Sequence, residues 1–212
     1  MTYSLAIALS TAKRFSDALP IFEAALQEAV ASQEELIDAN FYFNYGATAE
    51  QAGFLDKAAT LLKKSIELDP SKASRAYNYL GYMWVDRNIN LDEAGALIKK
   101  ALEMEPDNGA YCDSLGWFYF KKGDFVRALT ELMHAAEIIT PPDPVVFEHI
   151  GDAHRALGNI PQALTYWQKA LNLDPQNQGL VSKIEQSRAH LTSNPTNSPP
   201  VALPSPSSAP SP

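Results

Sequence analysis

Apolar residues recur along much of this chain at positions i, i+3, i+4 and i+7, which is the spacing of an amphipathic α-helix. Two neighbouring stretches, 110–120 and 126–141, show the pattern clearly. Their apolar stripes consist of Leu115, Phe118, Tyr119, Ala128, Leu129, Leu132, Ala135 and Ala136. Gly123 and Asp124 lie between the stretches and interrupt the pattern. The sequence therefore predicts two helices joined by a short turn.

This pair of stretches recurs along the chain. The first stretch contains a glycine every 35 residues, and these glycines are Gly46, Gly81, Gly116 and Gly151. The second stretch contains an alanine in each copy, and these alanines are Ala58, Ala94, Ala128 and Ala163. The other copies have comparable interruptions and stops, namely Gly53, Asn88–Asn90, Gly158–Asn159, Pro70, Pro106 and Pro175. A period of this size predicts stacked helical hairpins, since one hairpin alone cannot bury its apolar face.

The repeated glycine needs a physical reason, because glycine inside a helix costs about 1 kcal/mol relative to alanine. A side chain at Gly116 would push the paired helix away from the first helix of the hairpin. We therefore predict that the two helices of each hairpin approach closely at this position.

The order Leu-Gly, an aromatic residue three positions later, then Ala and Pro resembles the tetratricopeptide repeat. The matching residues are Leu80, Gly81, Trp84, Ala94 and Pro106 in one copy, and Ile150, Gly151, Gly158, Ala163, Trp167 and Pro175 in another. The resemblance covers about residues 1–175, including a degraded first copy that keeps Ala18, Phe22 and Ala25. It implies an all-α solenoid in which helical hairpins wind into a right-handed superhelix.

We predict five hairpins, at about 1–31, 33–70, 74–106, 108–141 and 144–175. Ser32 and Glu35 have the spacing of a capping box, which predicts that the second hairpin opens early, near Gln33.

Two further segments follow the last hairpin. Residues 176–192 are predicted to form a capping helix, with Leu180, Ile184 and Leu191 on its apolar stripe. Residues 193–212 contain seven prolines, six serines and no charged residue. A segment of this composition cannot bury a core, so we expect a disordered tail.

Composition narrows the function. The 212 residues carry a formal net charge of −8, which argues against a nucleic-acid surface. No apolar run reaches the ~18 residues of a membrane span, so no direct membrane insertion is expected. Residues 1–12 lack the pattern of a signal peptide. They begin directly in a helical pattern, from which we expect the chain to be a piece of a longer array.

Catalytic chemistry has little support in the sequence. The single cysteine, Cys112, is predicted to be an inert core residue. The richest cluster of reactive side chains contains Glu148, His149, Asp152 and His154, but the two histidines are five residues apart and do not share a helix face. His154 is predicted to be a core histidine. We therefore expect a non-catalytic protein with no cofactor and no metal site, and keep a metal-dependent hydrolase as a less favoured alternative.

In tetratricopeptide arrays the first helices line a concave groove that carries partner peptides, and the resemblance implies the same here. The predicted binding residues are Asn44, Arg75, Asn78, Tyr79, Tyr82, Asp113, Trp117, Phe120, Glu148, His149 and Asp152. Tyr79, Tyr82, Trp117 and Phe120 form the predicted aromatic strip, flanked by carboxylates. The expected partner is a protein or extended peptide, apolar with basic character. A solvated polar face with incidental aromatic residues, and an oligomerisation module, are the alternatives.

The segments "DRNINLDEA" and "NGAYCDSLGW" are similar to the C-terminal repeats of bacterial exported tetratricopeptide proteins, many of them outer-membrane lipoproteins. This resemblance implies a scaffold or adaptor in the periplasm or cell envelope, with a cytoplasmic location as the alternative. The subclass that clamps the C-terminal carboxylate of chaperones is disfavoured, because Asp113 and Glu148 would repel a carboxylate.

Overall fold

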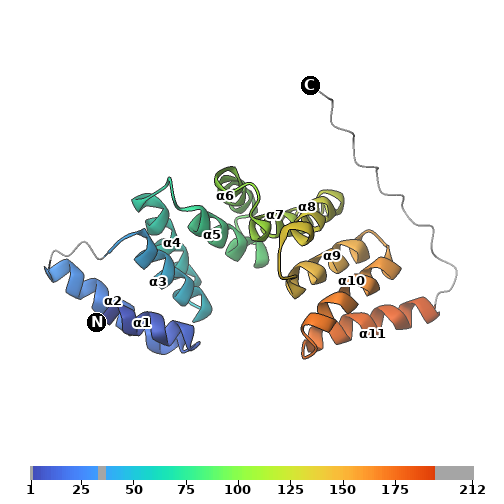
Figure 1. Cartoon of the computed structure of the whole chain (residues 1–212), viewed down its shortest axis with the longest axis horizontal. Helices are drawn as coiled ribbons and strands as arrows, with labels where there is room; N and C mark the ends of the chain where they lie inside the picture. Colours follow the sequence, from blue (N-terminus) through green and yellow to red (C-terminus); the bar gives the residue numbers. More distant parts are fainter. Residues whose placement is uncertain (1, 33–36, 194–212) are drawn as a thin grey trace, which may run out of the picture. The chain divides into compact units, whose positions relative to one another are not determined.

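The computed structural model describes residues 2–32 and 37–193, and every regular element in those ranges is an α-helix (Figure 1). The helices are α1 (Thr2–Thr11), α2 (Phe15–Ser32), α3 (Ala39–Gln51), α4 (Leu55–Leu68), α5 (Ser74–Asp86), α6 (Leu91–Met104), α7 (Gly109–Lys121), α8 (Phe125–Ile138), α9 (Pro144–Ala156), α10 (Ile160–Leu173) and α11 (Gln178–Ser193). The predicted all-α fold class is confirmed.

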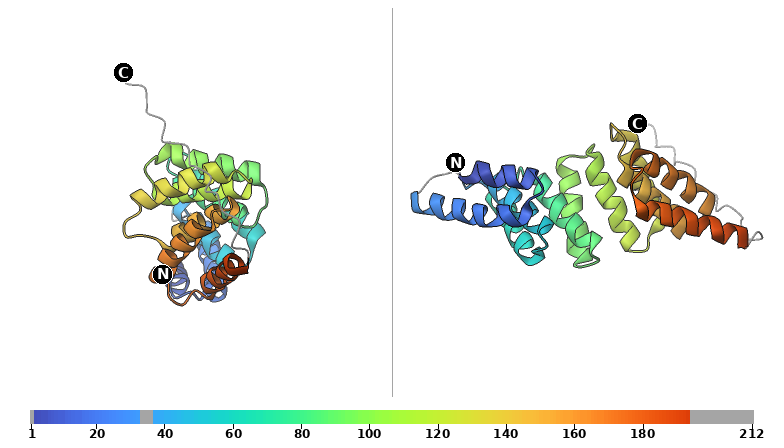
Figure 2. Two further views of the ribbon diagram at one scale, coloured as in Figure 1. Left: turned by 90° about the vertical axis from the view of Figure 1, so that its right-hand side faces the viewer. Right: turned by 90° about the horizontal axis from the view of Figure 1, so that it is seen from below.

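The chain divides into two compact units, residues 1–114 and residues 115–212, with the boundary inside α7. In unit 1, α1 packs on α2, α3 on α4 and α5 on α6. In unit 2, α9 packs on both α8 and α10, and α10 packs on α11 (Figure 2). Each unit is therefore built from helices that pack on their neighbours in sequence, as a repeat protein requires.

Short turns join the helices at the predicted interruptions. Gly53, Gly123 and Gly158 have φ angles of +89°, +78° and +78°. This left-handed conformation strains any residue with a side chain, which explains glycine at these turns. Asn88 and Asn90 take φ angles of 57° and 47° in the corresponding turn of unit 1. The predicted helix breaks are confirmed.

The predicted close approach of paired helices is also confirmed. A Cβ atom added at Gly116 would lie 2.6 Å from Leu132 Cγ and 3.1 Å from the backbone oxygen of Ala128. At Gly151 the added atom would lie 2.4 Å from Trp167 Cδ1. Real Cβ atoms do not approach their neighbours so closely, so glycine allows each hairpin to close.

The start of α3 differs from the prediction. The helix begins at Ala39, and the side chain of Asp38 caps it by accepting a 2.8 Å hydrogen bond from the Phe41 backbone N–H. The predicted start near Gln33 is therefore wrong, because Asp38 satisfies the free N–H groups at this later position. Ser32 is the last residue of α2, whereas Glu35 of the predicted capping box and residues 194–212 of the predicted disordered tail lie outside the described residues.

The helix bounds are consistent with five hairpins and a cap, but this division into repeats and the right-handed winding remain predictions. The interior of unit 1 contains an aromatic group in which Phe22 and Tyr45 stack with ring centroids 4.9 Å apart. In unit 2, Leu180 and Ile184 of α11 are buried against Trp167 of α10, as expected of a capping helix. Leu191 is half-buried.

Candidate protein-interaction site

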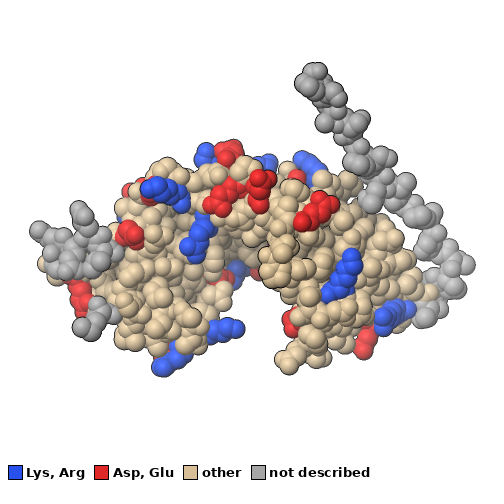
Figure 3. Space-filling model, viewed as in Figure 1, with Lys and Arg blue, Asp and Glu red and all other residues tan. Residues whose placement is uncertain are grey.

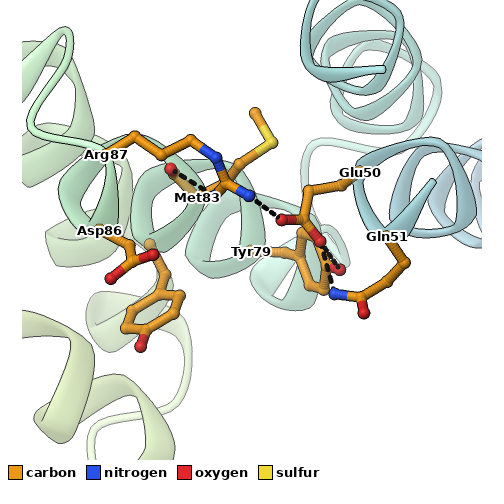
Figure 4. Close-up of a pocket in the computed structure, with 7 residues that line it drawn as sticks. Glu50, Gln51, Tyr79, Met83, Asp86 and Arg87 are labelled. Carbon is orange, nitrogen blue, oxygen red and sulfur yellow. Dashed lines mark hydrogen bonds and ion pairs between the residues drawn. The ribbon is translucent and has the colours of Figure 1, made fainter. Parts of the chain in front are cut away.

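A pocket in unit 1 brings together two of the predicted aromatic residues, Tyr79 and Tyr82. Its volume is about 300 Å³, and it lies where the C-terminal end of α3 faces α5. We call it the unit 1 pocket, and its lining residues are Glu50, Gln51, Tyr79, Tyr82, Met83, Asp86 and Arg87 (Figure 4). Aromatic, thioether and charged groups therefore share one small cavity on the first helices of two predicted hairpins.

Glu50 organises one wall of the unit 1 pocket. Its carboxylate accepts hydrogen bonds from the Tyr79 hydroxyl at 3.1 Å, from Gln51 Nε2 at 2.6 Å and from the Arg87 guanidinium (Figure 4). Arg87 also donates to the backbone oxygen of Met83 at 3.1 Å. The Glu50 side chain is only 10% exposed, so its charge is held in place by these donors.

Tyr79 is fixed as a neutral hydrogen-bond donor. Burial, followed by the negative charge of Glu50, raises the pKa of its hydroxyl to about 12. The Phe43 and Tyr79 rings are nearly perpendicular, with centroids 5.6 Å apart, and the Arg75 guanidinium lies 4.3 Å from the Phe43 centroid. The phenol ring of Tyr79 is therefore rigidly placed before any partner arrives.

The other predicted residues of unit 1 are engaged or buried. Asn44 donates a 2.8 Å hydrogen bond to the Tyr3 hydroxyl of α1. Asp113 is buried, with 8% of its surface exposed. Asn78 is half-buried, and its Oδ1 has no hydrogen-bond partner in the described part of the chain. The unit 1 site is therefore centred on Tyr79 and Tyr82.

In unit 2, Trp117 stacks on two rings. Its ring lies 4.5 Å from Phe120 and 4.0 Å from His149, with interplanar angles of 9° and 11°. Only 9% of Trp117 is exposed, which is less than an open anchor residue requires. The continuity of the predicted aromatic strip from Tyr79 and Tyr82 to Trp117 remains a prediction.

A lysine that the sequence reasoning did not single out neutralises two predicted carboxylates. Lys183 Nζ of α11 donates to Glu148 Oε1 at 2.7 Å and to Asp152 Oδ2 at 2.7 Å. Asp152 also accepts a 3.0 Å hydrogen bond from Trp167 Nε1. Burial alone would lower the pKa of Lys183, but the hydrogen bonds to Asp152 and Glu148 and the negative charges of both carboxylates together raise it.

The polar end of unit 2 is thus occupied by the chain itself. A recess of about 280 Å³ is lined by Phe120, Asp152, Arg155, Ala156 and Lys183, so two cations share it with the predicted acidic residue Asp152. In the sequence, the pairing of Lys183 with Glu148 and Asp152 is indicated only by the position of Lys183 directly before Ile184, a core residue of the capping helix.

The two histidines of the cluster Glu148, His149, Asp152 and His154 have different surroundings. His149 stacks on Trp117, whereas His154 is buried and stacks on Tyr166 of α10. Among residues 2–32 and 37–193, no group of three or more His, Cys, Asp or Glu side chains could hold a metal ion. Cys112 and His154 lie in the core, as predicted. In the same ranges no helix is long and apolar enough to cross a membrane.

The fold and this site define a helical-repeat protein with a preformed surface pocket. The tetratricopeptide repeat model matches residues 3–182, and the chain belongs to the tetratricopeptide repeat family. Proteins of this family generally serve as protein-interaction scaffolds. No curated protein matches the sequence.

Solved structures show the same fold at low sequence identity. TTC0263, a thermophilic TPR protein of Thermus thermophilus, has a TM-score of 0.71 and 20% identity over 89% of this chain and 97% of that chain. MamA AMB-1 has a TM-score of 0.63 and 22% identity over 82% and 98%. The APC/C hetero-tetramer Cut9–Hcn1 has a TM-score of 0.77 and 15% identity over 90% of this chain and 36% of that chain.

Proposed function

We propose that this protein is a non-catalytic scaffold or adaptor that binds an extended segment of a partner protein along the first helices of its hairpins. The observation that carries the proposal is the unit 1 pocket, in which Tyr79 and Tyr82 lie beside a fixed Glu50–Arg87 pair. A preformed pocket with aromatic walls and a few oriented polar groups is typical of a recognition site.

The partner segment carries an apolar side chain followed by a lysine or arginine. Tyr82 and Met83 supply apolar contact for the apolar side chain of the partner. The exposed carboxylate of Asp86 lies at the same pocket and would pair with the lysine or arginine. A cation also gains from contact with a tyrosine ring. The net charge of −8 favours approach of such a partner.

We place the protein in the bacterial periplasm or cell envelope, as an adaptor like the exported proteins whose repeats it resembles, with the cytoplasm as the alternative. The support is the resemblance carried by residues 86–94 and 108–117. Fractionation of the native organism with an antibody against the chain tests this, and recovery in the cytoplasmic fraction would contradict it.

The binding proposal is tested by selecting twelve-residue peptides from a displayed library against the full chain. The selected peptides should combine an aromatic or aliphatic residue with a lysine or arginine. Tyr82→Ala should weaken their binding by about 2 kcal/mol, the usual effect of removing a central anchor. Asp86→Asn should weaken it less and should reduce the salt dependence.

Asp107→Asn is the matched control, because Asp107 is an exposed aspartate of unit 1 outside the pocket. It should bind the peptides like the parent. Equal binding by Tyr82→Ala and the parent, with both folded by circular dichroism, would refute the proposal.

Self-association is a second candidate function. Leu5 on α1 is 51% exposed, and burial of this apolar side chain against a second copy would favour association. Light scattering over a concentration series tests this candidate. A monomer throughout the series removes it, whereas an oligomer that Leu5→Gln dissociates supports it.

A further inference from the structure

The position three residues after each repeat glycine differs in size from one repeat to the next. At this spacing Ala49 follows Gly46, Trp84 follows Gly81, Tyr119 follows Gly116, and His154 follows Gly151. Imidazole is smaller than indole or phenol. The helices that surround His154 in unit 2 therefore pack against a smaller ring than the helices around Trp84 do.

In the repeat of Gly81, in unit 1, the space around this position is filled and covered. Trp84 is only 4% exposed. Lys63 Nζ of α4 lies 5.0 Å from the centroid of the Trp84 ring, and it forms a 3.1 Å ion pair with Glu93 Oε1 of α6. The Trp84 ring and the ion pair between Lys63 and Glu93 thus fill the space between the second helices α4 and α6.

In unit 2 all three of these residues are replaced. His154 stands for Trp84, and Met133 precedes it by the same interval by which Lys63 precedes Trp84. Gln162 stands for Glu93, each directly before the repeat alanine. The result is a mainly apolar pocket of about 320 Å³. We call it the His154 pocket, and it is lined by Val126, Leu129, Thr130, Met133, His154, Gln162 and Tyr166.

We propose that the His154 pocket is a second docking site, which receives a tryptophan side chain of a partner protein. Unit 1 fills the equivalent place with its own tryptophan, so an indole ring has the shape that this packing accepts. Leu129, Met133 and Tyr166 supply apolar, thioether and aromatic contact. The exposed amide of Gln162 offers a carbonyl oxygen to the indole N–H. The site lies mainly on the second helices α8 and α10, with His154 from α9, and does not rest on the unit 1 pocket.

His154 itself supports a site rather than a packing defect. The residue is only 5% exposed, and its Nδ1 has no hydrogen-bond partner among the described residues. Burial lowers its pKa, so the imidazole is neutral and presents no charge to an apolar occupant.

The tryptophan has to come from another protein. The chain has three tryptophans, Trp84, Trp117 and Trp167, and their exposed fractions are 4%, 9% and 0%. Residues 33–36 and 194–212 contain no aromatic residue. Neither a second copy nor the chain's own C-terminal segment can therefore supply the ring.

The test is a titration of the isotopically labelled full chain with N-acetyl-tryptophanamide, followed by NMR. The amide signals of Leu129, Met133 and Tyr166 should shift in a saturable manner, and N-acetyl-alaninamide should leave them in place. Shifts that centre on Tyr79 and Tyr82, or no saturable shift at all, would overturn the proposal.

Two variants close the pocket in different ways. His154→Trp introduces the ring that the repeat of Gly81 uses. Met133→Lys with Gln162→Glu introduces the covering ion pair at the exposed Gln162 and the half-buried Met133, whose sulfur accepts a 3.3 Å hydrogen bond from the Tyr166 hydroxyl. Each should weaken N-acetyl-tryptophanamide binding at least tenfold while the circular dichroism spectrum is unchanged. His134→Tyr, at an exposed position of α8, is the matched control and should bind like the parent. Parental affinity in the folded double variant would overturn the proposal, even if His154→Trp fails to fold.

Discussion

Single glycines decide how closely the helices of this protein pack. At Gly116 and Gly151 the neighbouring side chains occupy the space that a Cβ atom would need. The 35-residue recurrence of glycine was therefore sufficient to predict a close approach. The sequence could not indicate which side chain fills each gap, because Leu132 and Trp167 reach these glycines only after the hairpin has closed.

Gly116→Ala should destabilise the protein by about 1–3 kcal/mol, the usual cost of overpacking a core. The added methyl would lie 2.6 Å from Leu132 Cγ. Helix propensity alone predicts the opposite sign, since alanine is favoured over glycine by about 1 kcal/mol. Urea unfolding followed by circular dichroism measures the difference. A stabilised variant would show that the helices do not meet at this position.

His154 should make the protein less stable in mild acid. Burial lowers its pKa in the folded state below the ordinary 6.5, so the unfolded chain binds a proton more readily. The contribution of neutral His154 to the free energy of unfolding is complete above pH 6.5. It is lost as the pH falls from 6.5 through the pKa that His154 has in the folded state. The loss is at most about 1.4 kcal/mol per pH unit.

The measurement compares urea unfolding at pH 7.0 and pH 5.5 for the parent and His154→Tyr. The difference in unfolding free energy between the two pH values should be smaller in the variant, which has no imidazole at this site. An unchanged difference would contradict the assignment of the acid sensitivity to His154.

At the scale of the element, the periodic pattern predicted the helices and their breaks, but two features depended on other information. The start of α3 was set by the single cap residue Asp38, which a hydrophobic pattern does not contain. The role of α11 was only half predicted. Its apolar stripe indicated a cap, whereas the contacts of Lys183 with Glu148 and Asp152 span more than thirty residues and depend on how α11 docks.

Lys183→Ala should lower the free energy of unfolding by about 2 kcal/mol. The substitution leaves two half-buried carboxylates, Glu148 and Asp152, without their common cation. Arg188→Ala is the matched control on the same helix, because Arg188 is exposed, and it should change stability by less than about 0.5 kcal/mol. Equal effects of the two substitutions in urea unfolding would show that the Lys183 contacts contribute no net stability.

At the scale of the whole molecule, Figure 3 shows one face of the surface. Most of that face carries neither acidic nor basic residues. The family and fold followed from the recurrence of a few small and aromatic residues. The proposed site did not follow as directly, because burial of Trp117 and the internal pairing of Asn44, Glu148 and Asp152 are consequences of packing.

The burial of Trp117 also changes which substitution tests the groove. Replacing this residue by alanine removes stacking on Phe120 and His149, so a loss of binding would be mixed with a loss of stability. Tyr82 is half-buried at the unit 1 pocket, so its replacement separates an effect on binding from an effect on stability better than replacement of Trp117 does.

The central claim is that a partner segment lies on the first helices of unit 1. Hydrogen–deuterium exchange of the full chain, with and without a saturating selected peptide, tests it most directly. Protection should appear in α5 and in the C-terminal part of α3, around Tyr79, Tyr82 and Glu50, and should be lost in Tyr82→Ala. Protection confined to the second helices α4 and α6, with the peptide fully bound, would contradict the account.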